Sequence, residues 1–241
     1  CISSAASDVY KRQVKMYEEK IIPPKKSMPQ AVDGTLRKFA LRVPEVIYQC
    51  SGIMIFGKRI KSLVFSTDLS IIKNVNADAI IAVYPFTPQP IITQALLLAA
   101  DIPVFAGVGG GLTQGQRVVN LAMFAEMQGA TGVVVNAPTP GRILNRIRSS
   151  VDVPVVVTVA NADTNYRHRI EDGAAILNVA AGAQTPEIVA EIRERFPDYP
   201  ILATGGADDE SIRATIRAGA NAIIWTPPTS GELFRLSLIH T

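Results

Sequence analysis

Three segments of the chain follow one template: "DIPVFAG" (Asp101–Gly107), "DVPVVVT" (Asp152–Thr158) and "DYPILAT" (Asp198–Thr204). Each begins with an Asp-x-Pro turn and continues as a short, nearly uninterrupted apolar run. Such runs are typical of parallel strands that are buried on both faces of a sheet. The three segments therefore predict three strands of one parallel sheet.

A second template alternates with the first. Its apolar runs follow a Gly-Ala or Asn-Ala turn and read "NADAIIAVYP" from Asn76, "GATGVVVNAP" from Gly129, "GAAILNVAAG" from Gly173 and "GANAIIWTPP" from Gly219. "KSLVFSTD" from Lys61 completes a set of eight predicted strands. A unit that recurs in this way indicates an internally repeated fold.

Stretches with helical character separate the strands. In "IVAEIRERF" and "SIRATIRAG" the apolar residues stand three and four positions apart, with charged residues on the outer face. The expected helices are Pro88–Ala100, Leu112–Gln128, Pro140–Ser149, Thr164–Glu171, Pro186–Arg195 and Asp209–Ala218. Repeated strand–helix alternation predicts an α/β fold of the (β/α)8 TIM-barrel type. A last helix begins at Ser230 and is expected to be truncated at Arg235.

Both ends of the chain look foreign to this pattern. Codons for Asp8–Gln13 ("DVYKRQ") can be chosen so that their reverse complement encodes Leu-Ser-Leu-Ile-His, the sequence at Leu236–His240. This inverted repeat resembles the transposon ends used to build sequencing libraries. Residues 1–13 and 236–241 are therefore expected to be adapter-derived tails of a bacterial metagenomic fragment, and they are left out of the fold prediction.

The remaining chain is expected to have two parts. Residues 14–59 form a basic N-terminal extension, and residues 60–235 form the barrel. The basic character is concentrated at the front, because residues 14–73 hold eleven Lys and Arg against five Asp and Glu. The extension is expected to contain a helix near Ala31–Leu41 and a short hairpin at "IMIFGKRI", which could cover the bottom of the barrel.

The composition limits the kinds of binding partner and the cellular compartment that can be expected. A chain of 241 residues that is 48% hydrophobic can bury the core of one large α/β domain. Its net charge of +3 is too small to indicate nucleic-acid binding, and no apolar run approaches the ~18 residues of a membrane span. Only Cys1 and Cys50 occur, which favours a reducing cytoplasm. Formation of a homo-oligomer is left open.

Polar residues end several of the predicted strands. Active sites of (β/α)8 barrels lie at the C-terminal ends of the strands. Alternate positions counted from the turn alanines are expected to face inward, which brings Asn136, Asn178 and Thr226 to the barrel mouth, and Thr158 and Thr204 end two further strands. We expect the two asparagines to be catalytic and the three threonines to bind substrate. The alternative for the asparagines is local hydrogen bonding to loop backbone.

Asp68 is the one acidic residue that is obviously placed at the C-terminal end of a predicted strand. It is a candidate catalytic base, or a residue that holds a substrate hydroxyl. Aspartate is also a preferred N-cap residue, because its carboxylate accepts hydrogen bonds from the first free amides of a helix. The sequence leaves the catalytic and the capping interpretations open.

Glycines mark two further candidate binding loops. Gly205-Gly206 and Ser230-Gly231 follow the seventh and eighth strands, and free backbone amides at such positions favour an anion. Barrels often bind a phosphate between these two loops, so the four residues are predicted to hold phosphate. Gly109 and Gly110, in "GVGGGLTQGQR", either approach a substrate closely or form a plain turn before a helix.

Two resemblances extend this interpretation. "PILATGGADDESIRATIRAGANAIIWTPPTSGELF" is similar to the last two β/α units of the phosphate-binding TIM barrels of the ribulose-phosphate-binding type, which include lyases, isomerases, epimerases and flavin barrels. The longer stretch from Leu36 to Phe234, with "LRVPEVIYQCSGI", "GKRIKSLVFSTD", "YPFTPQP" and "GVGGG", resembles an uncharacterised bacterial β/α-barrel family often labelled "hydrolase". The resemblance implies a small phosphorylated ligand but gives no mechanism.

The residues that the chain lacks narrow its chemistry. No lysine follows Lys73, which rules out a Schiff-base lysine on the later strands. His168 lies between two arginines and is expected on an outer surface, and His240 lies in the C-terminal tail, so no histidine-based metal site is predicted. Three functions remain: an enzyme of the lyase, isomerase or hydrolase type, a barrel that binds FMN, and a barrel that binds a phosphorylated ligand without catalysis. No cofactor is predicted for the first.

Overall fold

The computed structural model describes residues 30, 32, 41–162 and 164–239, with the side chains of the last helix described through residue 235. The chain divides into two units, residues 1–38 and residues 39–241. The helix expected over Ala31–Leu41 falls almost entirely outside the described residues, so it stays a prediction. All that follows concerns the second unit.

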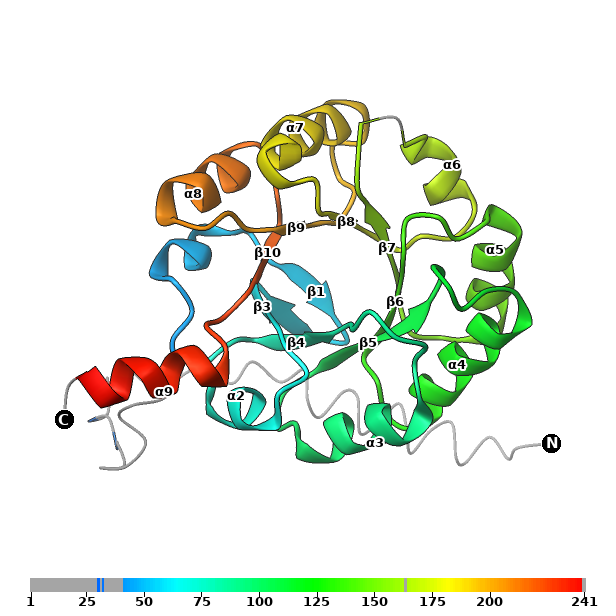
Figure 1. Ribbon diagram of the computed structural model, residues 1–241. Helices are drawn as coiled ribbons and strands as arrows, with labels where there is room; N and C mark the ends of the chain where they lie inside the picture. The colour runs from blue at the N-terminus through cyan, green and yellow to red at the C-terminus, as the bar shows by residue number, and fades with distance from the viewer. Residues whose placement is uncertain (1–29, 31, 33–40, 163, 240–241) are drawn as a thin grey trace, which may run out of the picture. The chain divides into compact units, whose positions relative to one another are not determined.

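Eight parallel strands close into a barrel, as the repeats predict (Figure 1). Each strand pairs with the next along the chain, and the last pairs with the first. The strands are β3 (Ser62–Phe65), β4 (Ala79–Ala82), β5 (Val104–Gly109), β6 (Gly132–Val135), β7 (Val155–Val159), β8 (Ile176–Val179), β9 (Ile201–Thr204) and β10 (Ala222–Trp225).

Helices surround the barrel and confirm all six of the expected internal helices within a few residues. They are α2 (Leu69–Asn74), α3 (Pro90–Ala99), α4 (Gln116–Met127), α5 (Gly141–Ser150), α6 (Tyr166–Glu171), α7 (Thr185–Arg195), α8 (Asp209–Arg217) and α9 (Ser230–Ile239). Two short 3-10 helices, η2 (Glu45–Gln49) and η3 (Gly182–Gln184), complete the set of described helices.

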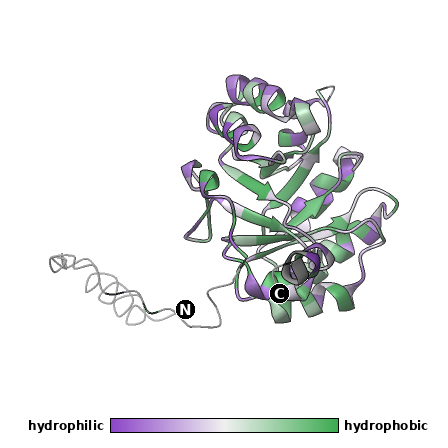
Figure 2. Ribbon diagram, turned by 60° about the vertical axis from the view of Figure 1, so that its left-hand side comes forward, coloured by the Kyte–Doolittle hydropathy of each residue, from purple (hydrophilic) through white to green (hydrophobic). Residues whose placement is uncertain are grey.

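The strands divide the apolar core into two layers. Leu63, Ile81, Phe105, Val134 and Ile224 belong to an inner cluster that fills the barrel. Alternate residues of the same strands belong to an outer cluster between the sheet and the helices. The inward and outward assignments made from the turn alanines are thereby confirmed. Figure 2 shows the same arrangement, with hydrophobic strands inside a ring of helices that carry both hydrophilic and hydrophobic residues.

A hairpin closes the N-terminal end of the barrel. Strands β1 (Ile53–Ile55) and β2 (Lys58–Ile60) pair in antiparallel fashion directly before β3, so the hairpin predicted at "IMIFGKRI" is confirmed. Ile53, Ile55 and Ile60 are buried and belong to the inner cluster. Gly52 also donates its amide to the carbonyl of Asn221, just before β10, at 2.8 Å. Residues 52–60 therefore form the floor of the barrel.

The last helix differs from the expectation. The sequence predicts that this helix is truncated at Arg235, but α9 continues to Ile239. The physical reason is local, because Leu236, Leu238 and Ile239 favour or tolerate a helix and no glycine or proline interrupts the stretch. In the part of the chain that the structure describes, no helix has the length and apolar character that would allow it to cross a bilayer.

Candidate functional site

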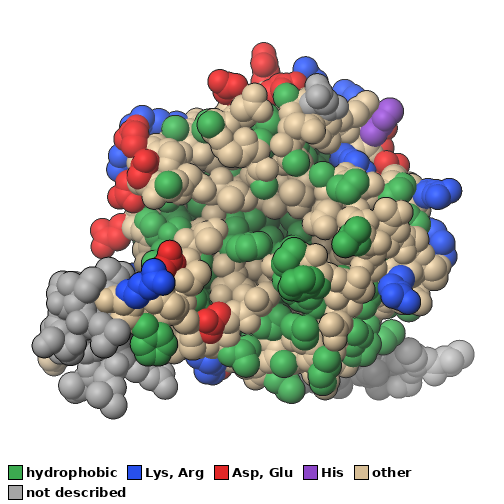
Figure 3. Space-filling view, viewed as in Figure 1, with side chains coloured by type: hydrophobic (Ala, Val, Ile, Leu, Met, Phe, Trp, Pro, Cys, Tyr) green, Lys and Arg blue, Asp and Glu red, His purple; other side chains and the backbone are tan. Residues whose placement is uncertain are grey.

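The loops that follow the eight barrel strands form the mouth of the barrel, which faces the viewer in Figures 1 and 3. By sequence, none of the residues between each of these strands and the next helix is Lys, Arg or His, whereas Asp68, Asp163 and Asp208 supply carboxylates. Figure 3 shows hydrophobic and uncharged atoms around the central hollow, with Lys and Arg toward the edges of this face. A ligand at the mouth would be held by uncharged polar groups, by backbone amides and by apolar contacts.

A row of polar residues lies along the inner wall on adjacent strands. Thr158 of β7 pairs in register with Asn178 of β8, and Asn136 follows β6 one position beyond the pair Val135–Val157. These positions continue the inward alternation of the inner cluster. Thr204, the last residue of β9, is half-buried, and β9 is the strand next to β8 in the barrel. The structure thus brings the predicted residues Asn136, Thr158, Asn178 and Thr204 to one side of the mouth.

Asn178 has the most unusual environment of the row. Its side chain is 5% exposed, and its Oδ1 atom is buried without a hydrogen-bond partner among the described residues. A buried polar group without a partner costs about 1–3 kcal/mol, and native structures contain few of them. The Asn178 Oδ1 atom is therefore available to accept a hydrogen bond at the end of the barrel where active sites of this fold lie.

Asp68 occupies a hydrogen-bonded cluster at the start of two helices. It is the N-cap of α2, where its Oδ1 atom accepts from the amide of Ser70 at 2.8 Å and from that of Ile71 at 3.4 Å. The Ser70 hydroxyl donates to the same atom at 2.6 Å, and the Ser230 hydroxyl donates to Oδ2. The capping interpretation is confirmed, and the carboxylate is already satisfied by protein groups.

These hydrogen bonds also favour the ionised form of the Asp68 carboxyl. The Ser230 hydroxyl, followed by the Ser70 hydroxyl, lowers the pKa of the Asp68 carboxyl below its ordinary value of 3.8, because both stabilise the ionised form. A general base that acts near neutral pH needs a raised pKa. The environment of Asp68 therefore favours a fixed negative charge over proton transfer.

The predicted phosphate residues lie in two separate places. Ser230 lines an apolar depression with Leu41, Ile71 and Phe234, on the side of α9 that faces α2. Gly205 and Gly206 line a different pocket, together with residues of the loop before α7. The Gly205 amide donates to the Ile224 carbonyl at 2.9 Å, so it is not available to an anion as predicted, whereas the amides of Gly206, Ser230 and Gly231 have no acceptor among the described residues. No described pocket contains both pairs.

The start of α9 is capped within its own first turn. Thr229 and Glu232 exchange hydrogen bonds: the Glu232 carboxylate accepts from the Thr229 amide at 2.7 Å, and Thr229 Oγ1 accepts from the Glu232 amide at 3.2 Å. The bonds from Thr229 lower the pKa of Glu232. The amides of Ser230 and Gly231 remain without a protein acceptor among the described residues. They are the two amides at this helix start that could bind an anion.

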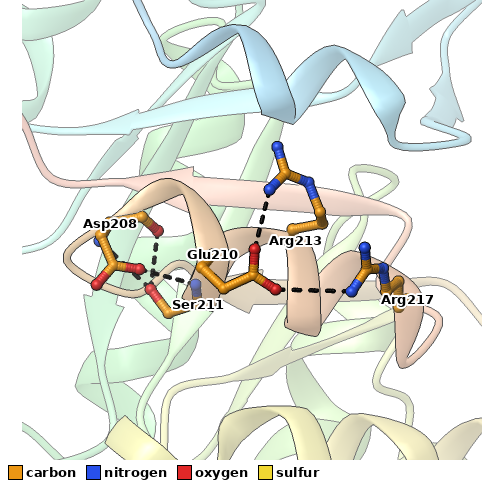
Figure 4. A network of polar contacts seen from close by, with 5 residues as sticks. All are labelled: Asp208, Glu210, Ser211, Arg213 and Arg217. Carbon is orange, nitrogen blue, oxygen red and sulfur yellow. Dashed lines mark hydrogen bonds and ion pairs between the residues drawn. The ribbon is translucent and has the colours of Figure 1, made fainter.

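Gly206 is required by the cap of the next helix. Asp208 and Ser211 form a capping box at the start of α8, and Glu210 pairs with Arg213 at 3.0 Å (Figure 4). A Cβ atom on Gly206 would lie 2.0 Å from Ser211 Oγ, so only glycine fits there. The hydrogen bonds from Ser211 lower the pKa of Asp208. A negative charge therefore stands within three residues of the predicted anion loop.

Gly109 and Gly110 shape a turn at the end of β5. Both have positive φ angles, +117° and +99°, which other residues rarely adopt. The register between β5 and β6 shifts between Gly107 and Gly109. A Cβ atom on Gly110 would lie 1.9 Å from Thr139 Oγ1. These contacts give both glycines a structural role, and Gly109 also lines the pocket described next.

A pocket that the sequence did not indicate is lined by the loops after β4 and β5. It is small: its accessible volume is about 60 Å³, within about 440 Å³ of empty space that includes open solvent. Its lining residues are Val83, Tyr84, Pro85, Phe86, Thr87, Pro88, Gly107, Gly109, Gly111, Leu112, Thr113, Val134 and Asn136. We call it the β4–β5 pocket. Residues from two loops 25 or so positions apart form its walls, and no spacing in the sequence could indicate that they meet.

The remaining candidates lie outside these sites. Thr226 is exposed at the rim of the mouth, and His168 is exposed on α6, as expected. Cys50 is buried, and burial raises the pKa of its thiol to about 11, so it stays a packing residue. Among the described residues, no group of three or more His, Cys, Asp and Glu side chains is arranged to hold a metal ion.

Comparison with known proteins supports the fold and leaves the family open. No protein-family model matches the chain, and no curated protein matches it. The fold is similar to that of 2,3-dimethylmalate lyase, a member of the PEP mutase/isocitrate lyase superfamily, with a TM-score of 0.57 and 11% identity over 81% of this chain and 83% of that chain. Other solved structures give the same picture.

Phosphonopyruvate hydrolase, solved with oxalate and Mg²⁺, has a TM-score of 0.56 and 12% identity over 76% of this chain and 79% of that chain. The 4-hydroxy-tetrahydrodipicolinate synthase of Methylacidiphilum fumariolicum SolV has a TM-score of 0.56 and 18% identity over 76% of this chain and 74% of that chain. At such identities the likeness shows the fold alone. The chain is a (β/α)8 barrel whose solved neighbours include a lyase, a hydrolase and a synthase, and the two resemblances seen in the sequence stay predictions.

Proposed function

We propose that this chain is a TIM-barrel enzyme of the lyase or hydrolase type that acts on a small phosphorylated metabolite at the barrel mouth. The observation that carries the proposal is the buried, unpaired amide oxygen of Asn178. It lies at the end of the barrel where enzymes of this fold bind their substrates. Isomerase chemistry would use the same site.

The inner row gives this site its polar contacts. Neighbouring strands lie about 4.8 Å apart, so Asn136 and Asn178, two strands apart, are separated by a span that a three- or four-carbon compound could bridge. Each amide can donate to a carbonyl oxygen or accept from a hydroxyl. Thr158 stands between them and offers a hydroxyl. Preorganised donors of this kind stabilise negative charge that develops on an oxygen in a lyase or hydrolase reaction.

The phosphate would be held by backbone amides. Ser230 and Gly231 keep free amides at the start of α9, where the helix dipole favours an anion, and Gly206 keeps a free amide in a separate pocket before α8. The Asp68 carboxylate accepts the Ser230 hydroxyl and would repel a dianion placed against it. A phosphate bound at the start of α9 would therefore lie on the side of the Ser230 and Gly231 amides that faces away from Asp68.

A second candidate function is a barrel that binds a phosphorylated ligand without catalysis. The observation that favours it is the environment of Asp68, whose carboxylate caps α2 and has a lowered pKa. Comparing Asp68→Asn with the parent protein separates the two functions once a substrate is known. An enzyme that uses Asp68 loses turnover, whereas a binding protein keeps its affinity.

The test is a thermal-shift screen of phosphosugars, nucleotides and FMN on the complete gene product. The proposal expects at least one compound to raise the Tm of the parent protein. Asn178→Leu should abolish that shift, and Asn120→Leu, on the outer surface of α4, should preserve it. Gly231→Asp adds a negative charge where a Cβ atom has open space, and it should weaken binding without disturbing the fold.

The outcomes of this screen are distinct. A yellow purified protein that is stabilised by FMN would establish the flavin alternative. Stabilisation that persists in both Asn178→Leu and Gly231→Asp would show that the compound binds elsewhere. If no phosphorylated compound stabilises the parent protein, the proposed substrate class is wrong.

A further inference from the structure

We propose that the β4–β5 pocket binds a small apolar group of the substrate, on the opposite side of the mouth from its phosphate. The inference rests on the proposed function and specifies its substrate class. The substrate would be a compound with a phosphate at one end and a short alkyl or comparable apolar group at the other. Its reacting polar centre would lie between them, on the row from Asn136 to Asn178.

The composition of the pocket is the first argument. Val83, Pro85, Phe86, Leu112 and Val134 supply apolar side chains, and no lining residue carries a charge. Three of the polar lining side chains, those of Thr87, Thr113 and Tyr84, already have hydrogen-bond partners. Thr113 donates its hydroxyl to that of Thr87 at 3.1 Å, and the Tyr84 hydroxyl accepts from the Gln89 amide at 2.8 Å. The space that remains suits an apolar group better than a charged one.

The exposure of two lining residues is the second argument. Phe86 is 73% exposed and Leu112 is 91% exposed, and they come from the two loops that form the pocket walls. A single exposed apolar residue is common on protein surfaces. Two large exposed apolar side chains that line one pocket indicate a surface that a ligand covers. In Figure 3, hydrophobic side chains gather beside the central hollow on this side of the mouth.

The pocket is also preformed and continuous with the polar row. The Gly110 amide donates to the Thr113 carbonyl at 2.9 Å, and the Asn136 amide donates to the Gly109 carbonyl at 3.0 Å, so the glycine loop is fixed by backbone bonds. Asn136 lines the pocket and is the first member of the row that leads to Asn178. A preformed pocket binds with a smaller entropic cost than one that must be ordered.

The experiment uses four probes: inorganic phosphate, methyl phosphate, n-butyl phosphate and n-butanol. Their dissociation constants are measured on the full chain by NMR chemical-shift titration. A fully buried methylene group strengthens binding by about fourfold. We therefore expect n-butyl phosphate to bind at least tenfold more tightly than methyl phosphate, since it adds three methylene groups, of which some reach the pocket.

Two variants locate the effect. Leu112→Ser should reduce the preference for n-butyl phosphate over methyl phosphate to less than threefold. The affinity for inorganic phosphate should stay unchanged. Leu98→Ser is the matched control, because Leu98 is 81% exposed on α3 and does not line the pocket. Leu98→Ser should keep the full preference for n-butyl phosphate over methyl phosphate. Both sites are exposed, so neither change should prevent folding.

The results separate this inference from the proposed function. Equal affinity for the two alkyl phosphates, or a preference that survives Leu112→Ser, overturns the apolar subsite. If no phosphate binds but n-butanol shifts the signals of the pocket residues in the parent protein and not in Leu112→Ser, the phosphate assignment fails and the apolar subsite stands. If inorganic phosphate binds, but n-butanol shifts no signals and the length of the alkyl chain does not change the affinity, the apolar subsite fails and the phosphate assignment stands.

Discussion

Asn178 is the residue on which the proposed site depends most. Among the described residues, its Oδ1 atom is the buried side-chain atom that lacks a hydrogen-bond partner. Asn221 offers a contrast within the same barrel. It accepts from Arg193 at 2.7 Å and from the Ile201 amide at 2.9 Å, and it donates to Ser51 at 2.9 Å. Asn221 therefore stabilises the fold through its hydrogen bonds, whereas Asn178 Oδ1 has no partner among the described residues.

The two asparagines should therefore respond differently to the same substitution. Asn178→Leu removes a buried unpaired oxygen at nearly constant volume, so we expect the free energy of unfolding to stay the same or rise by about 1 kcal/mol. Asn221→Leu leaves the Ile201 amide without its acceptor and removes one of several acceptors of the Arg193 guanidinium, so it should cost about 3 kcal/mol. Urea denaturation measures both. A loss above about 1 kcal/mol in Asn178→Leu would show that its amide is already paired.

The contribution of Asp68 to stability should depend on pH. Its folded-state pKa lies below the ordinary value of 3.8 because of the hydroxyls of Ser230 and Ser70. A lowered folded pKa gives stability that is present above the unfolded pKa and is lost as the pH falls through the folded value. Asp68→Asn should thus be less stable than the parent protein at neutral pH.

The difference between the two proteins should shrink once the pH falls below 3.8 and disappear below the folded pKa of Asp68. Urea denaturation at a series of pH values measures it, and Ser230→Ala should produce a smaller change of the same sign. Arg195→Ala is a control, because its exposed ion pair with Glu191 contributes little. A difference that stays constant down to the lowest pH would contradict the assigned charge.

At the scale of elements, the loop after β5 shows how backbone geometry builds the mouth. Gly110 and Gly129 have nearly equal φ angles, +99° and +96°, but different surroundings. A Cβ atom on Gly110 would collide with Thr139, whereas one on Gly129 meets nothing within 4 Å. The first glycine is needed for its angle and for space, and the second is needed for its angle alone.

Alanine at each position should separate the two requirements. Gly129→Ala is expected to cost about 1–2 kcal/mol of stability from the backbone angle. Gly110→Ala should cost at least ~2 kcal/mol more, because the Thr139 side chain and the loop must move. The added substitution Thr139→Ala should recover part of this extra loss. Thermal and urea unfolding measure all three proteins, and equal costs at both glycines would refute the close contact.

Elements were predictable from the sequence where one local signal decided them. The Asp-x-Pro and Gly-Ala turns fixed the starts of strands, and the apolar alternation correctly placed Val134 and Ile224 inside the barrel. Contacts between distant loops were not predictable. The bond between Asp68 and Ser230 joins residues 162 positions apart, and the β4–β5 pocket depends on two loops meeting. Neither leaves a periodic pattern in the chain.

At the scale of the whole molecule, the barrel is open at one end and closed at the other. The hairpin β1–β2 inserts Ile53, Ile55 and Ile60 into the inner cluster, while Met54 on the opposite face is 55% exposed. Part of the stretch assigned to an N-terminal extension therefore packs as the barrel floor. Figure 1 shows the hairpin behind the ring of strands, away from the mouth.

Removing an apolar contact of the floor should destabilise the whole barrel. Ile60 is 1% exposed, and Ile60→Ala is expected to lower the free energy of unfolding by about 2–5 kcal/mol, through lost burial and the cavity left behind. Met54→Ala, on the exposed face of the same hairpin, should change it by less than ~0.5 kcal/mol. If urea denaturation gives the same value for both, the hairpin is not part of the core.

The central claim, that the mouth binds a small phosphorylated ligand through Asn178, is tested most directly on the asparagine side chains themselves. The best compound of the thermal-shift screen is added to the ¹⁵N-labelled protein, and the side-chain amide signals are followed by NMR. We predict that the signals of Asn178 and Asn136 shift and saturate together, while that of Asn120 on α4 stays in place. A saturable compound that leaves the Asn178 signal unmoved would contradict the account.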